Sequence, residues 1–137
     1  SYRYYRVMMN VTGLAAAGYV GLQFNGDSTS GHYAWFGESA GQAQKASSIS
    51  DSKLLVDDPK ASFSVARLAV CDIWDSTTSG AFVQCNVSYD NTATTQYAIQ
   101  GSGFWTGTTQ INSITVLTST GGNLNSGTGI TVLGIVS

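Results

Sequence analysis

Apolar residues recur at every second position in several short segments of this chain, which is the period of a β-strand. In residues 19–25, for example, Val20, Leu22 and Phe24 alternate with small or polar residues. About eight such segments occur between stretches rich in Gly, Asn and Ser; they are residues 3–11, 19–25, 50–56, 62–74, 81–89, 95–100, 111–117 and 130–136. No segment shows a convincing helical period, so the pattern predicts an all-β protein.

Short strands separated by turn signals at this spacing are typical of sandwiches. We predict a jelly-roll-like β-sandwich of about eight antiparallel strands, with the first and last strands near each other. Residues 50–56 form the weakest segment, because Asp51 and Lys53 interrupt it, and residues 26–48 are expected to be a long loop. There is no internal repeat or linker, so residues 1–137 are predicted to be one domain.

The first and last predicted strands carry apolar or aromatic residues on both faces. Tyr2, Tyr4 and Met8 lie on the face opposite Val7, and Ile135 belongs to an equally apolar last strand. A strand in an isolated sandwich needs only one apolar face. We therefore expect a neighbouring subunit to cover the outer face, with contacts through Tyr2, Tyr4, Met8 and Ile135. The alternative is that these side chains are tolerated at the surface.

The composition strengthens the expectation of an assembly. Hydrophobic residues make up 42% of the chain but charged residues only 10%, against about 25% in ordinary soluble domains. So few charges provide little repulsion between copies, which favours an oligomer or a larger assembly. The net charge of −2 argues against a nucleic-acid partner. No stretch is long and apolar enough to span a membrane, and the start lacks a signal-peptide pattern, so we expect synthesis in the cytoplasm.

Catalytic chemistry is hard to assemble from these residues. His32 is the single histidine, and no Gly-x-Ser-x-Gly elbow occurs. Asp72 and Asp75 flank Trp74, a combination that could serve a glycosidase, but placement at a strand end and turn is the favoured interpretation. Asn25-Gly26-Asp27 is likewise interpreted as a turn instead of a calcium site. We predict no enzymatic activity, no metal and no cofactor.

The aromatic residues Tyr33, Trp35 and Phe36 fall in the expected loop and are the best candidates for contact with a protein or a sugar. Equally, they could close one end of the sandwich. Asp57-Asp58-Pro59 is interpreted as the opening of another loop.

The two cysteines, Cys71 and Cys85, fall opposite each other if the intervening turn is centred on Thr78. Both then point into the core. Two buried free thiols are the favoured interpretation, because synthesis in the cytosol is reducing, and a disulfide formed after cell lysis is the alternative.

Two parts of the chain resemble a known family. Residues 105–115 read Trp-x-x-Thr-x-x-Ile-x-Ser-Ile-Thr, residues 121–128 read Gly-x-Asn-x-x-x-Gly-Thr, and residues 133–135 read Leu-Gly-Ile. Near the start, residues 24–27 read Phe-Asn-Gly-Asp, followed by Tyr33. This order is similar to that of small bacteriophage virion proteins, which are β-jelly-roll modules serving as head decoration proteins, head fibres or receptor-binding domains of tails. The resemblance covers about the first and last quarters of the chain.

The resemblance implies a non-enzymatic phage structural protein located in the virion. Because the first predicted strand opens almost at Ser1, we expect no fibre shaft before it, and this favours a capsid decoration (cement) protein that binds and stabilises the outer head surface. Such proteins commonly form trimers, so the resemblance implies a homotrimer, which the two apolar faces of the terminal strands suit. The expected partners are other copies of the chain, the major capsid protein and a host surface glycan. The alternative is a receptor- or carbohydrate-binding domain of a tail fibre.

Overall fold

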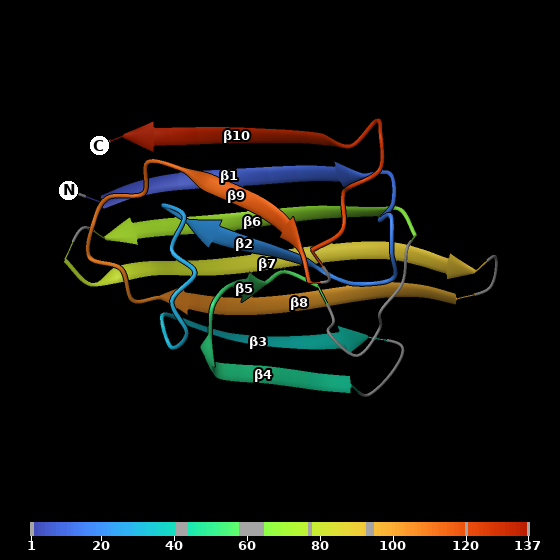
Figure 1. The fold of residues 1–137 in the computed structure, drawn as a ribbon, viewed down its shortest axis with the longest axis horizontal. Coiled ribbons are helices and arrows are strands. Elements are labelled where there is room, and N and C mark those ends of the chain that lie inside the picture. The colour runs from blue at the N-terminus through green and yellow to red at the C-terminus, as the bar shows by residue number, and fades with distance from the viewer. Residues whose placement is uncertain are drawn as a thin grey trace.

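Strands in two sheets account for most of the chain. The computed structural model describes residues 2–40, 44–57, 65–76, 78–92, 95–119 and 121–136, and within them it contains strands β1 to β10 and no helix. All strand pairs are antiparallel, and the two sheets pack face to face as a sandwich (Figure 1). The prediction of an all-β sandwich is confirmed, while the jelly-roll order stays a prediction.

The larger sheet contains seven strands in the order β10-β1-β6-β7-β8-β3-β4. Their bounds are Gly129–Val136, Tyr2–Val11, Arg67–Ser76, Gly80–Thr92, Thr95–Trp105, Tyr33–Ala40 and Gln44–Asp51. The predicted proximity of the first and last strands is confirmed, because β1 pairs with β10 along its length. In consequence β10 forms one edge of the sheet and β4 the other.

The smaller sheet lies across one face of the larger sheet (Figure 1). Its strands, in the order β5-β2-β9, are Leu54–Leu55, Val20–Phe24 and Ile114–Thr118. The core lies between the sheets, and β1, β3, β6, β7 and β8 contribute alternate residues to it, as the period of two requires. Its largest fully buried members include Trp105, Tyr33, Phe24, Leu22, Leu54 and Ile73.

The prediction of a loop over residues 26–48 is wrong for most of this range, because β3 and β4 occupy it. Tyr33 and Trp35 alternate inward on β3, but Gly, Ser and Ala fill most other positions and hide the period. Strand β4 is a polar edge strand that is held by its pairing with β3. Residues 50–56 do not form one strand either, since they divide between the end of β4 and the short β5.

The two segments that carry the family resemblance meet around Asp27. Its Oδ2 accepts a hydrogen bond from Trp105 Nε1 at 2.8 Å and lies 2.7 Å from His32 Nδ1. Asn25, which has a φ of 54°, accepts hydrogen bonds from the backbone amides of Asn112 and Ser113. The turn predicted at residues 25–27 is confirmed. These motif residues therefore join the β2–β3 turn to the segment between β8 and β9.

A buried ion pair links Asp57 to Arg67, whose side chains are 0% and 1% exposed. Arg67 also donates to the carbonyl of Gly18 at 3.3 Å, and its guanidinium lies 5.4 Å from the ring centroid of Tyr89. The sequence interpretation of Asp57 as a loop opener missed this role. Asp58 and Pro59 lie outside the described residues.

Candidate functional site

The face of the large sheet that points away from the small sheet carries the candidate site; we call it the outer face. No described element covers it, so side chains that alternate with the core residues stay exposed. On β6, Leu68, Val70 and Trp74 are 58%, 36% and 43% exposed, and on β7 Phe82 is 57% exposed. Such a concentration of exposed apolar side chains is typical of a contact surface.

An aromatic row, composed of Tyr4, Trp74, Phe82 and Phe104, crosses the outer face perpendicular to the strands. Each member is the register partner of the next on β1, β6, β7 and β8. The ring centroids of Tyr4 and Trp74 are 5.8 Å apart, and those of Phe82 and Phe104 are 4.9 Å apart with an edge-to-face tilt. Ile135 of β10, which is 63% exposed, extends the row to the edge of the sheet.

An ion pair adjoins the aromatic row. Arg6 holds Asp72 with two hydrogen bonds, from Nε at 2.7 Å and from Nη2 at 2.9 Å. The hydroxyl of Tyr4 also donates to Asp72. The hydrogen bond from Arg6 is the main cause that lowers the pKa of Asp72, and the hydrogen bond to Asp72 is the main cause that raises the pKa of Tyr4. Both charges of this pair are therefore already satisfied within the chain.

Asp72 and Asp75 do not form a catalytic pair, because they point to opposite faces of the sheet. Asp75 is fully buried on the inner side, where its Oδ2 accepts a hydrogen bond from the amide of Ile111 at 2.9 Å. Both residues lie near the end of β6, as expected, but inside the strand and not in the turn, since β6 continues to Ser76. The local pattern missed this because a single polar pair at a strand end looks the same as the start of a turn.

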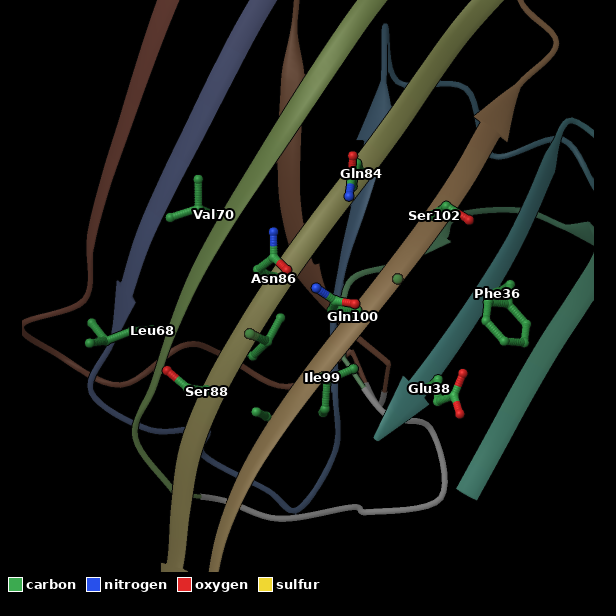
Figure 2. Close-up of a pocket in the computed structure, with 13 residues that line it drawn as sticks. Phe36, Glu38, Leu68, Val70, Gln84, Asn86, Ser88, Ile99, Gln100 and Ser102 are labelled. Atoms are coloured by element: carbon green, nitrogen blue, oxygen red, sulfur yellow. The ribbon is translucent and has the colours of Figure 1, made fainter. Parts of the chain in front are cut away.

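Next to the aromatic row, the outer face is hollowed over β6, β7, β8 and β3 (Figure 2). The hollow has a volume of about 780 Å³ and is lined on its floor by amide and hydroxyl side chains. These are Gln84, Asn86, Ser88, Gln100 and Ser102. Figure 2 shows Leu68 and Val70 on one side of the amides and Phe36 and Glu38 on the other.

The structure separates the aromatic residues that the sequence grouped as one contact loop. Tyr33 and Trp35 are buried; the Tyr33 hydroxyl donates to the carbonyl of Asp27 and accepts from the amide of Phe24, and burial raises its pKa to about 12. Phe36 alone is exposed, at 41%, and it faces the hollow.

The predicted oligomer contacts on the terminal strands lie on the surface. Met8 is 36% exposed and Ile135 is 63% exposed, both on the outer face with Tyr4. The side chain of Tyr2 lies outside the described residues. Sequence reasoning missed Phe82 and Phe104, although alternation with the buried Val83, Cys85 and Val87 could have placed Phe82 outward.

Cys71 and Cys85 are register partners on β6 and β7, as the expected turn centre requires, and both are buried. They form a disulfide, so the favoured interpretation of two free thiols differs from the structure. The bond lies on the inner face and takes no part in the candidate site.

Comparisons with known proteins add no family. No family model matches this chain, and neither a curated protein nor a solved structure matches it. Among the described residues, no group of three or more His, Cys, Asp or Glu side chains could hold a metal ion. The same part of the chain offers no helix that could cross a membrane.

Proposed function

We propose that this chain is a non-enzymatic structural protein of a bacteriophage particle, a decoration protein that binds the outer surface of the head as a homotrimer. The observation that carries the proposal is the uncovered aromatic row, with Tyr4, Trp74, Phe82 and Phe104 side by side on a regular sheet. Trp74 and Phe82 are exposed, and Tyr4 and Phe104 are half-buried; a monomer in water gains nothing by leaving these rings uncovered together, whereas an interface gains from burying them. The resemblance of the two terminal segments to phage virion proteins supports the choice of particle.

The low charge supports the same function. Charged residues are 10% of the chain, and on the outer face Arg6 and Asp72 neutralise each other. Contacts between copies, and with the major capsid protein, would then depend mainly on apolar burial. Such contacts weaken little as salt is raised, unlike contacts between unpaired charges.

The homotrimer is tested by light scattering over a range of protein concentrations. Phe82→Ser should shift the association midpoint more than tenfold, because burying a Phe side chain contributes about 1.5–3 kcal/mol. Gln84→Ser, the next outward position on β7, is the matched control and should associate as the wild-type protein does. A wild-type protein that stays monomeric at every concentration would contradict the trimer.

The location on the head is tested with particles of the phage that encodes the chain. A decoration protein should be present in many copies over the head, and particles that lack it should release DNA at a lower temperature, since a bound protein stabilises what it binds. Few copies at the tail, with unchanged heat resistance and lost adsorption, would instead support a receptor-binding domain of a tail fibre.

A further inference from the structure

We propose that the hollow on the outer face is a binding site for an uncharged oligosaccharide. The hollow lies beside the aromatic row on the outer face, but none of the residues of the row lines it. Polar side chains line its centre (Figure 2). Its volume of about 780 Å³ is within the range of small-ligand sites. The inference does not depend on the role of the chain in a particle.

The chemistry of the floor matches the hydroxyl groups of a sugar. Gln84 stands opposite Ser102, and Asn86 stands opposite Gln100, on the paired strands β7 and β8. Each side-chain amide offers donors and an acceptor together, and a sugar hydroxyl needs both. Within the described part of the chain, none of these four side chains makes a hydrogen bond, so their hydrogen-bonding groups point to the solvent of the hollow.

The charge of the hollow favours an uncharged ligand. Its described lining contains no Lys or Arg, and Glu38 is its one ionisable side chain. Beside the aromatic row, Arg6 is already held by Asp72 with two hydrogen bonds. A phosphate or an acidic sugar is bound best by charge-assisted hydrogen bonds from Lys or Arg, which the described lining does not contain.

The walls of the hollow provide apolar surface for the C–H faces of a sugar ring. Phe36 is 41% exposed on one side, and Leu68 and Val70 are exposed on the other. A peptide that adds to a sheet needs a free strand edge. Strands β7 and β8 are paired on both edges, so this surface offers side chains and not backbone. A sugar uses such a surface better than an extended peptide does.

The site is tested by NMR on the isotopically labelled full chain. The probes are maltotriose, cellotriose and chitotriose, which are uncharged, and sialyllactose, which is anionic. At least one uncharged trisaccharide should shift the side-chain NH₂ signals of Gln84, Asn86 and Gln100 with saturation on the order of 1 mM. Gln110 and Asn123, exposed amides outside the hollow, should not respond.

Variants distinguish a specific site from general weak contact. Asn86→Ala and Gln100→Ala should each weaken binding about tenfold, because each removes hydrogen bonds that the sugar makes. The matched control Gln110→Ala should bind as the wild-type protein does. The proposal is overturned if no uncharged trisaccharide shifts the three amides, if sialyllactose shifts them more strongly, or if all three variants bind alike.

One further measurement separates this proposal from self-association. If the three amide signals shift on dilution without any sugar, the hollow belongs to a contact between copies, and the sugar site is overturned while the trimer is supported. If the protein forms no trimer but the sugar titration succeeds, the sugar site is supported and the homotrimer is contradicted.

Discussion

The inner and outer faces of the large sheet are built by the same strands, yet they meet different surroundings. On β6, Ile73 is fully buried against the small sheet, while its neighbour Trp74 is 43% exposed. Both faces carry large apolar residues, so hydrophobicity alone does not distinguish them. The difference is that the small sheet covers the inner face, whereas no described element covers the outer face. An apolar residue in a strand therefore does not by itself show which face of the sheet the rest of the chain covers.

Two of the ion pairs among the described residues repeat this comparison. Arg67 and Asp57 are enclosed in the interior, whereas Arg6 is 45% exposed beside Asp72 on the outer face. Removing one member of an enclosed pair leaves an uncompensated charge, but a solvent-exposed charge is compensated by water. Removing the Arg side chain should therefore lower the free energy of unfolding far more in the enclosed pair than in the exposed pair.

The largest expected effect comes from Arg67→Leu, which should lower the free energy of unfolding by about 3–5 kcal/mol, because the buried carboxylate of Asp57 loses the guanidinium of Arg67. Urea unfolding monitored by tryptophan fluorescence measures the loss. Arg6→Leu is the control on the outer face and should leave the unfolding midpoint almost unchanged. Equal losses in both variants would show that the outer pair is enclosed as well.

Adjacent residues of β6 provide the second test. Ile73→Ala should lower the free energy of unfolding by about 2–5 kcal/mol, since it opens a cavity in the core. Trp74→Ala should change unfolding of the dilute protein little and should weaken association between copies. Urea unfolding and light scattering on the same samples check both outcomes. If Trp74→Ala unfolds as easily as Ile73→Ala, the outer face stabilises the single chain and not an assembly.

Loss of the disulfide should have the third largest effect on stability. It joins residues separated by 14 positions, and closing a loop of that length stabilises a fold by about 3 kcal/mol. Reduction should therefore lower the unfolding midpoint of the wild-type protein. The double variant Cys71→Ala, Cys85→Ala should show the lower midpoint with or without reductant. A wild-type midpoint that ignores the reductant would contradict a bond in the folded protein.

The smallest expected effect is the loss of stability in acid that depends on Asp27. Burial alone would raise the pKa of Asp27, but hydrogen bonds from Trp105, His32 and Thr29 lower it well below 3.8. A carboxyl whose pKa is lower in the folded chain than in the unfolded chain stabilises the fold at pH values above its unfolded pKa. This contribution is lost as the pH falls below about 4. The slope is at most about 1.4 kcal/mol per pH unit.

Asp27→Asn provides the control for this acid dependence. The variant should be less stable than the wild-type protein at pH 6, and the difference should shrink as the pH falls to 2. Thermal unfolding followed by circular dichroism at several pH values measures both proteins. A difference that stays constant across this range would show that the charge of Asp27 does not stabilise the fold.

The success of sequence reasoning varied with the strength of the local pattern. On β1 and β2, apolar and polar residues alternate clearly, and the predicted faces match the burial of Val7, Met9 and Leu22. On β3 and β4, small residues dilute the period, and two strands were read as a loop. The amides of the hollow could not be recognised, because Gln and Asn on an outward face are ordinary until neighbouring strands bring them together.

The sequence by itself determined the all-β class and the facing positions of Cys71 and Cys85. Each of these follows from a period of two and from turn placement, which act over a few residues. Tertiary structure alone decided that Asp57 meets Arg67, that Asp72 and Asp75 are on opposite faces, and that four rings form one row. Those relations depend on which strands become neighbours and in which register, and that outcome is set by packing of the whole chain.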